Sequence, residues 1–250
     1  MLNIAILFFM MTVTPYKDKH LTKKQQVEQM FDNISPKYDF LNHFLSLGID
    51  IAWRKKAIKL LSEVSPTTIL DIATGTGDFA IESLKLDPKE VIGVDISEGM
   101  LEKGREKIRN KKYDGIISLR KGDSEALSFE DNYFDGVIVA FGVRNFENLE
   151  KGLSEMLRVT REGGKIVILE FSKPGIFPFK QLYNFYFKAI LPLVGRSISS
   201  DSSAYTYLPE SVQQFPDGED FTNVLVKLGY RQVQCKPLTF GISSIYTGIK

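Results

Sequence analysis

A pair of closely spaced glycines with an acid on each side is the first feature of this sequence that suggests chemistry. Gly75 and Gly77 follow a short apolar run within residues 68–78, and they allow a tight turn whose backbone can approach a ligand. Asp71 lies before the turn and Asp78 directly after it. A strand, a glycine turn and a helix in this order are typical of a nucleotide site at the carboxyl end of a parallel strand.

Two classes of cofactor fit this turn. Residues 75–80 satisfy the dinucleotide pattern GxGxxA, and Asp95 follows Gly77 by 18 positions, near the ~20 expected of a ribose-binding acid. The pyrophosphate of a dinucleotide would lie at the N-terminus of the next helix, where Asp78 stands. Together with Asp71 it would repel phosphate and attract the ammonium and sulfonium groups of S-adenosylmethionine (SAM). The charges favour SAM, although the glycine pattern alone is weakly specific.

Two further acids follow the next two apolar runs. Asp95 ends the run at 91–94 and suits ribose hydroxyls, because an ionised carboxylate accepts several hydrogen bonds. Asp123, after the run at 116–119, suits the exocyclic amine of adenine. With Asp71 they form a set of three acids at three successive strand ends, which we expect to meet at one cofactor.

The elements that must position these acids alternate between strand and helix. Near-continuous apolar strands are expected at 68–72, 91–95, 116–119, 136–140 and 165–170, with helices at about 100–110 and 149–159. This alternation predicts an α/β fold around a buried parallel sheet. Two closing strands, 230–237 and 240–248, are joined so closely that we expect an antiparallel hairpin.

Helical patterns flank this core on both sides. Residues 23–61 read as helix with a break near Ser35 and Pro36, and a helical segment before the first strand often caps a cofactor site. An aromatic-rich stripe from Phe177 to Leu191 predicts a helix that packs as core or rests on a membrane surface. A polar loop at 197–203 and a helix pair at about 208–228 follow.

The composition limits the class of protein. The 250 residues are 43% hydrophobic and 25% charged, so a single sizeable domain is expected, and the net charge of +1 gives no reason to expect nucleic acid. The one cysteine, Cys235, excludes an intramolecular disulfide, and with only two histidines no spaced metal cluster is expected. The default compartment is a reducing cytoplasm.

The apolar N-terminus sets the expected domain limits. Residues 1–13 are too few for a membrane span of ~20 residues and lack the features of a signal peptide. We expect 1–12 to lie outside the fold, with Met10 or Met11 as an alternative start. Residues 13–250 then form one domain, made of a helical cap (13–65), a cofactor-binding core (66–172) and acceptor-side helices with the terminal hairpin (173–250).

These motifs resemble a known family. The glycine turn, Asp95 and the segment 122–127 resemble a Rossmann-like class I SAM-dependent methyltransferase. Segments 38–53 and 158–174 resemble the two signatures of the ubiquinone/menaquinone C-methyltransferase family, and 205–216 adds to the match, which runs from about Gln25 to the C-terminus. The resemblance implies a mostly parallel seven-stranded sheet with a C-terminal antiparallel hairpin and an N-terminal helical cap.

The resemblance also implies an activity and partners. The enzyme would methylate a ring carbon of a reduced prenylated naphthoquinol in menaquinone biosynthesis. A benzoquinol of ubiquinone biosynthesis and a non-enzymatic, cofactor-binding regulatory protein are the alternatives, because a fold does not determine function. The lipophilic acceptor suggests peripheral contact with the inner face of the membrane, for which the stripe at 177–191 is a candidate. We include a homodimer in the hypothesis.

The family's cofactor contacts would fall on Thr76, Asp95, Asp123 and Ser124, beside Asp71, Gly75 and Gly77 from the turn itself. Two positions depart from the family pattern. Asp50 stands where some members have a histidine, and Ala140 stands where some have a serine.

Arg144 is the candidate catalytic residue. An electron-rich ring carbon must attack the sulfonium methyl, and ionisation of a phenolic hydroxyl of the quinol raises the nucleophilicity of that carbon. A cation that stabilises the phenolate would assist. Arg144 follows the strand at 136–140, beside the expected methyl donor. Its alternative role is a structural pair with Asp or Glu.

Overall fold

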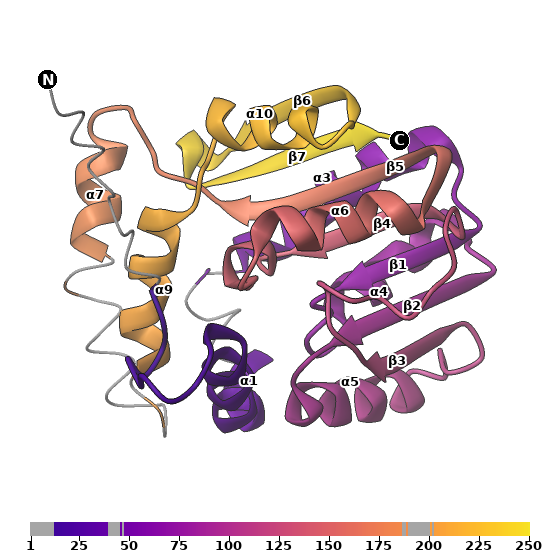
Figure 1. Cartoon of the computed structure of the whole chain (residues 1–250), viewed down its shortest axis with the longest axis horizontal. Helices are drawn as coiled ribbons and strands as arrows, with labels where there is room; N and C mark the ends of the chain where they lie inside the picture. Colours follow the sequence, from indigo (N-terminus) through magenta and orange to yellow (C-terminus); the bar gives the residue numbers. More distant parts are fainter. Residues whose placement is uncertain (1–12, 40–45, 47, 187–188, 190–200, 202) are drawn as a thin grey trace, which may run out of the picture.

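A seven-stranded sheet in the order β3-β2-β1-β4-β5-β7-β6 organises the protein (Figure 1). The structure is a computed structural model that describes residues 13–39, 46, 48–186, 189, 201 and 203–250. The strands are β1 (Thr68–Ile72), β2 (Glu90–Asp95), β3 (Ile117–Lys121), β4 (Phe134–Ala140), β5 (Thr160–Phe171), β6 (Arg231–Leu238) and β7 (Ser243–Ile249).

The first five strands are parallel, and the last two are antiparallel to their neighbours. This confirms the expected sheet and terminal hairpin. Several strands are longer than the apolar runs that predicted them. β5 begins at Thr160, so Gly163 and Gly164, which precede the apolar run at 165–170, lie within this strand. Strand β3 extends to Lys121, beyond the apolar run. Its last two residues are exposed, but they still pair with Val94 and Asp95 of β2.

The helices are α1 (Lys23–Ile34), α3 (Ile49–Leu61), α4 (Asp78–Ser83), α5 (Glu98–Asn110), α6 (Leu149–Val159), α7 (Phe179–Phe185), α9 (Ser203–Gln214) and α10 (Glu219–Lys227). The expected break near Ser35 and Pro36 is present, because α1 ends at Ile34 and residues 35–37 form a single 3₁₀ turn. Residues 40–45 and 47 of the expected helical cap, and the N-terminal extension 1–12, lie outside the described residues.

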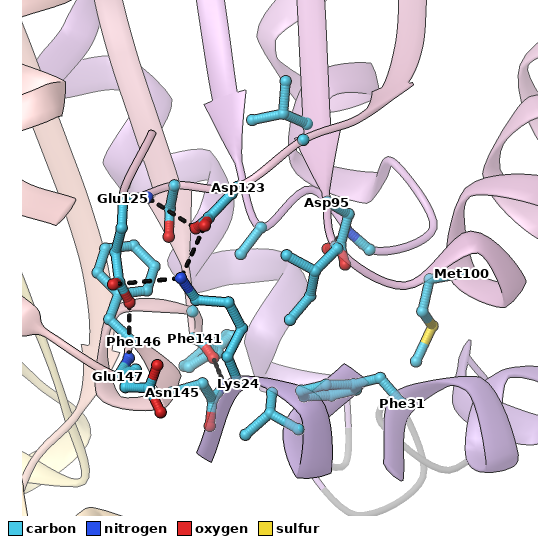
Figure 2. Close-up of a pocket in the computed structure, with 18 of the residues that line it drawn as sticks. Lys24, Phe31, Asp95, Met100, Asp123, Glu125, Phe141, Asn145, Phe146 and Glu147 are labelled. Carbon is cyan, nitrogen blue, oxygen red and sulfur yellow. Dashed lines mark hydrogen bonds and ion pairs between the residues drawn. The ribbon is translucent and has the colours of Figure 1, made fainter. Parts of the chain in front are cut away.

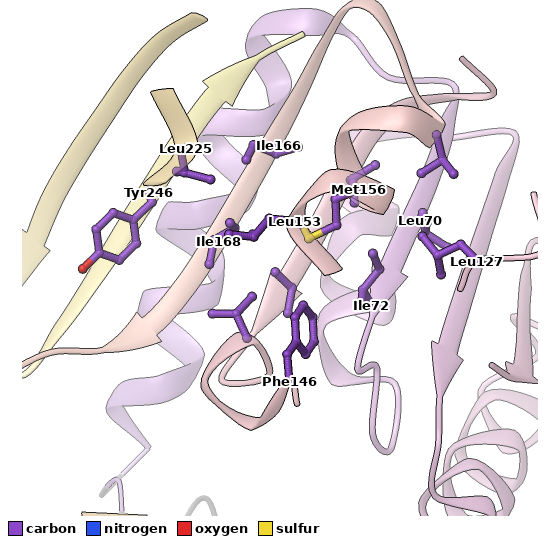
Figure 3. Packing of buried hydrophobic residues seen from close by; sticks show 14 of the residues in the cluster. Leu70, Ile72, Leu127, Phe146, Leu153, Met156, Ile166, Ile168, Leu225 and Tyr246 are labelled. Carbon is purple, nitrogen blue, oxygen red and sulfur yellow. The ribbon is translucent and has the colours of Figure 1, made fainter. Parts of the chain in front are cut away.

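Alternating residues of the central strand face two separate cores. Leu70 and Ile72 belong to a cluster with Leu153 and Met156 of α6, whereas Ile69 belongs to a cluster with Leu61 of α3. Figure 3 shows the α6 side of this arrangement. Because both faces of the sheet are covered, its strands are buried apolar runs. Helix α3, which we expected within the cap, therefore packs against the sheet.

The acceptor-side helices differ from the prediction in their bounds. Helix α9 begins at Ser203 and contains Pro209, whereas the expected start was near Leu208. Pro209 does not end this helix, although a proline in a helix interior usually kinks or breaks it. Helix α7 ends at Phe185, and the predicted stripe to Leu191 continues largely beyond the described residues. In Figure 1 the arrowheads of β1 and β5 point toward α1, α7 and α9.

Candidate cofactor and acceptor site

The glycine turn is held in place by the acid of the neighbouring strand. Gly75 and Gly77 both have positive φ, 56° and 81°, which explains why glycine occupies both positions. The Gly75 backbone N–H donates to Asp95 Oδ2 at 2.8 Å. Because β1 and β2 are parallel neighbours, their carboxyl ends meet, and the acid from β2 reaches the turn that follows β1.

A cavity opens at these strand ends. The space between its lining residues, open solvent at the mouth included, is about 670 Å³. Gly75, Asp95, Asp123 and Ser124 line it, as expected from the sequence. Figure 2 shows Asp95 at a strand end above Phe31 of α1, with Met100 of α5 to the right; all three line the cavity. The cavity thus combines acidic groups with apolar surfaces suited to a nucleoside.

Asp95 is buried and fully engaged with the backbone on both oxygens. Besides the bond from Gly75, its Oδ1 accepts from the Ser97 N–H at 2.9 Å. Burial raises the pKa of Asp95 to about 6, against the lowering effect of these hydrogen bonds. Each carboxylate oxygen accepts more than one bond, so Asp95 retains acceptor capacity toward the cavity.

Asp123 has a partner that the sequence did not reveal. Its Oδ2 lies 2.7 Å from Nζ of Lys24, which also lies 3.3 Å from Glu125 Oε2 (Figure 2). Lys24, on α1, lines the cavity together with both acids. An adenine amine at Asp123 Oδ2 therefore competes with the Lys24 ammonium for this oxygen.

Four residues expected at the site do not line this cavity: Asp71, Thr76 and Gly77 of the glycine turn, and the candidate catalytic residue Arg144. Asp71 lies buried under the turn, where it accepts from Thr74 Oγ1 at 2.6 Å, and burial raises its pKa to about 7. Thr76 Oγ1 donates to Asp39 at 2.5 Å and accepts from Lys107 Nζ at 3.0 Å. The glycine turn directs these side chains away from the cavity.

Asp78, expected to repel a phosphate, has cationic neighbours that the sequence did not reveal. Its Oδ1 lies 2.8 Å from Lys107 Nζ, an ammonium from α5 that also pairs with Asp39 at 2.5 Å. Because Lys107 lies beside Asp78 and Arg54 Nη1 lies 3.9 Å from Asp78 Oδ2, this carboxylate is not an isolated negative charge that would by itself repel a phosphate. The acids that line the cavity are Asp95, Asp123, Glu125 and Glu147, of which Asp123 and Glu125 pair with Lys24.

Arg144 forms a buried ion pair. Its Nη1 lies 2.7 Å from Glu170 Oε1 on β5, and the two side chains are 8% and 0% exposed. The guanidinium also donates to the carbonyl of Phe141 and lies 5.4 Å from the centroid of the Phe171 ring. Its Nε is buried and has no hydrogen-bond partner among the described residues. The structural pairing foreseen for Arg144 is therefore present, and one N–H remains available.

The two departures from the family pattern have simple structural settings. Asp50 is buried and pairs with Arg54 in the next turn of α3, while it accepts from Ser46 Oγ at 2.6 Å. Ala140, at the end of β4, lines the cavity beside Phe141. Among the residues that the structure describes, no group of three or more His, Cys, Asp or Glu side chains is placed to hold a metal ion.

Sequence reasoning missed the cavity residues that come from helix α1, which are Lys24, Val27 and Phe31. The helical pattern of residues 23–34 indicated that such a helix exists. It did not indicate which face would cover the strand ends, because that depends on how α1 packs on the rest of the chain.

Comparison with known proteins supports these observations. The chain is 52% identical over 239 residues to a demethylmenaquinone methyltransferase of Bacteroides fragilis, covering 95% of this chain and 97% of that protein. It is 45% identical to the protein of the same name from Porphyromonas gingivalis, covering 95% and 98%. A ubiquinone/menaquinone biosynthesis C-methyltransferase of Geobacter sulfurreducens is 44% identical, with 94% of each chain covered.

Solved structures share the fold at low sequence identity. A SAM-dependent methyltransferase of Thermotoga maritima superimposes with a TM-score of 0.61 at 19% identity, covering 89% of this chain and 99% of that one. A SAM-dependent methyltransferase of Aquifex aeolicus gives 0.55 at 18% identity, covering 77% and 88%. The strand order, with its antiparallel β7 between β5 and β6, is thus that of a class I SAM-dependent methyltransferase. The model of the ubiE/COQ5 methyltransferase family matches residues 19–250, and this chain belongs to that family.

Proposed function

We propose that this protein is a SAM-dependent C-methyltransferase that converts reduced demethylmenaquinone to menaquinol, the last step of menaquinone biosynthesis. The observation that carries the proposal is the 52% identity, over nearly the full length of both chains, to a demethylmenaquinone methyltransferase. The acidic, partly apolar cavity at the ends of β1, β2 and β3 supports it, because such a cavity suits a cationic nucleoside.

In this reaction a ring carbon of the quinol supplies the electron pair for the new carbon–carbon bond. The bond between the methyl group and sulfur breaks, and its electrons remain on sulfur, which becomes a neutral thioether. The ring then loses the proton from the methylated carbon and regains aromaticity. The oxidised quinone is electrophilic, so only the hydroquinone form serves as acceptor. Positioning the two reactants in line supplies much of the rate enhancement.

The cofactor contacts follow from the cavity. We assign Asp95 to the ribose hydroxyls of SAM. We place the methionine part of SAM beside the backbone of Gly75, whose N–H already donates to Asp95. Asp123 and Ser124 are assigned to the adenine, with Phe31 and Met100 as apolar neighbours. Asp71, Thr76 and Gly77 do not line the cavity. In this assignment they shape the glycine turn and do not contact SAM.

We assign Arg144 to the phenolate that develops on the acceptor. Its buried Nε lacks a partner among the described residues, and Phe141, Gly142 and Asn145 on either side of it line the cavity. A preorganised donor in a site shielded from water stabilises developing negative charge. Glu170 orients the guanidinium through its ion pair, so the two residues act together.

We further propose that the surface around α7 contacts the membrane that holds the acceptor. Ile176, Phe177, Leu182 and Phe185 are exposed there, and the ring of Phe240 stacks on Phe179 at 3.7 Å between centroids. Such a concentration of exposed apolar side chains marks an interaction surface. None of the helices in the described part of the chain is both long and apolar enough to cross a membrane.

Vesicle sedimentation tests this contact. The variant Phe177→Ser with Phe185→Ser should lose binding to phospholipid vesicles, whereas Val226→Ser, at an equally exposed apolar position on α10, should keep it. Equal binding by both variants would contradict the assignment. The homodimer stays a prediction.

A panel of acceptors tests the activity. Purified protein and methyl-labelled SAM should transfer label to reduced demethylmenaquinone and not to its oxidised form. A reduced polyprenyl benzoquinol tests the ubiquinone alternative, which the name of the Geobacter relative suggests. SAM binding without transfer to any quinol would favour the regulatory alternative.

A further inference from the structure

Tyr207 on α9 carries a buried hydroxyl without a partner in the described part of the chain. The residue is 2% exposed, and its OH makes no hydrogen bond with any described residue. Two other buried tyrosines are satisfied. The Tyr230 hydroxyl donates to the Leu153 carbonyl at 2.9 Å, and the Tyr246 hydroxyl accepts from the Gly218 N–H at 2.9 Å. An unsatisfied buried hydroxyl is unfavourable, so it calls for an explanation in terms of a missing partner.

The Tyr207 side chain lies next to the cofactor cavity. Its ring packs in one cluster with Val27 and Met30 of α1, with Phe31 and Ile96 against the same cluster. Three of these residues, Val27, Phe31 and Ile96, also line the cavity. Tyr207 therefore packs in the same cluster as three residues of the cavity wall, although it is not itself among the lining residues.

The charged pair Arg144 and Glu170 lies near enough to Tyr207 to influence its hydroxyl electrostatically. Arg144 and Glu170 both act electrostatically on Tyr207, and they act in the same way on the buried Tyr183 of α7. Burial raises the pKa of the Tyr207 phenol above its usual range, with a smaller opposing effect of Arg144. The group thus stays protonated at working pH, which makes it a hydrogen-bond donor and excludes it as a base.

We propose that the Tyr207 hydroxyl donates a hydrogen bond to a ring oxygen of the quinol and thereby positions the acceptor ring for methyl transfer. This inference rests on the proposed function. The ring oxygens are the strongly polar groups on an otherwise apolar acceptor, so they are the natural partners for a buried donor. The bond strengthens as the oxygen gains phenolate character, because hydrogen bonds to charged groups are stronger than those between neutral groups.

The variant Tyr207→Phe removes the hydroxyl and keeps the ring. We expect kcat/KM for reduced demethylmenaquinone to fall by about 10- to 100-fold, in the range of one hydrogen bond to a charged group. Affinity for SAM should be unchanged, and thermal stability should be unchanged or higher, because no hydrogen bond between described residues is lost. The matched control Tyr230→Phe removes the bond to Leu153, so it should lower the thermal stability and leave kcat/KM unchanged.

A binding measurement separates this inference from the proposed function. Trp53, the only tryptophan, packs against Phe141 of the cavity wall at 6.2 Å between ring centroids, so a bound quinone should quench its fluorescence. Oxidised short-chain demethylmenaquinone is the probe, since its carbonyl accepts a hydrogen bond and no transfer occurs. We expect Tyr207→Phe to weaken its binding by at least about threefold, a fraction of one hydrogen bond, and Tyr230→Phe to leave it unchanged.

The outcomes are distinct. Quinone binding that depends on Tyr207, in a protein that transfers no methyl group, would support the hydrogen bond from Tyr207 to the quinone and overturn the proposed function. Methyl transfer by the unaltered protein, combined with normal kcat/KM and normal quinone binding in Tyr207→Phe, would overturn the inference alone. Loss of stability in Tyr207→Phe as large as in Tyr230→Phe would also overturn it, because the hydroxyl would then have a structural partner.

Discussion

Removing Arg144 alone should destabilise the protein more than removing both members of its ion pair. The Arg144 and Glu170 side chains are 8% and 0% exposed, and their charged atoms lie 2.7 Å apart. In the variant Arg144→Gln the Glu170 carboxylate remains buried without its cation. Breaking a buried pair in this way costs about 3–5 kcal/mol of unfolding free energy.

The double variant Arg144→Gln with Glu170→Gln should recover most of that loss. The amide oxygen introduced at position 170 can still accept from the Phe171 N–H, which now donates to Glu170 Oε1 at 2.8 Å. Neither member of the former pair then carries a charge. We expect the double variant to lie within about 2 kcal/mol of the unaltered protein, because neutral replacement of a whole buried pair is often tolerated.

The stability deficit of Arg144→Gln should depend on pH. Burial raises the pKa of Glu170, and Arg144 opposes that rise; without the arginine the pKa should rise further. An acid whose pKa is raised in the folded state stabilises the fold when protonated and loses that contribution as pH rises. The deficit of the single variant should therefore be smaller at pH 5 than at pH 8.

Urea unfolding followed by Trp53 fluorescence measures these differences, since Trp53 packs on Phe171 next to the pair. Methyl transfer gives the second readout. If Arg144 stabilises the phenolate, the double variant should be stable and still lose about 10²–10³ in rate. Single variants that each cost less than about 1 kcal/mol and add in the double variant would refute the buried-pair reasoning. A stable, fully active double variant would refute the catalytic role.

Three further predictions concern the cofactor side. With the Asp95 pKa at about 6, SAM binding that needs the carboxylate should be about tenfold weaker at pH 5 than at pH 8, whereas Asp95→Asn should bind weakly without this pH dependence. Calorimetric titration at both pH values checks this, and equal affinities in the unaltered protein would contradict it. Lys24→Met should strengthen SAM binding by about two- to fivefold, because a partly exposed ion pair of ~0.5–1 kcal/mol no longer competes for Asp123. Weaker SAM binding would show that Lys24 contributes to the binding of SAM. Gly104→Ala should lower the free energy of unfolding in urea by about 1–3 kcal/mol, because its Cβ would lie 2.5 Å from Leu119 Cδ1 and 3.1 Å from the carbonyl carbon of Thr76. Unchanged stability would show that α5 moves freely away from the glycine turn.

The sequence was sufficient for features that follow from the parallel sheet. The order of apolar runs predicted the strands, and acids at successive strand ends had to meet at one edge, so Asp95 and Asp123 lie together at the cavity. The turn residues followed from the same logic. Asp71 and Thr76 are close in sequence to Gly75, which lines the cavity. The turn nevertheless directs their side chains away from the cavity, toward Thr74 and Asp39.

Partners that arrive from distant elements were not predictable. Lys107 of α5 balances Asp78, and Lys24 of α1 reaches Asp123 across 99 positions of sequence. Glu170 was within a recognised signature, but its pairing with Arg144 depends on the register of β4 and β5. The position of Tyr207 beside the cavity wall likewise depends on the packing of α9 against α1. Local pattern determines elements, whereas these contacts depend on how the elements pack.

The most direct test of the account is the chemical identity of the product formed from ¹³C-methyl SAM and reduced demethylmenaquinone. We predict a methyl group bound to a ring carbon, so the isolated quinol should oxidise in air to a labelled menaquinone whose ¹³C signal has the chemical shift of an aryl methyl group. The same incubation with the oxidised quinone should give no labelled product. A methyl group on oxygen, recognised by its methoxy chemical shift and by a product that no longer oxidises to a quinone, would contradict the account, as would the absence of labelled quinone from a protein that binds SAM.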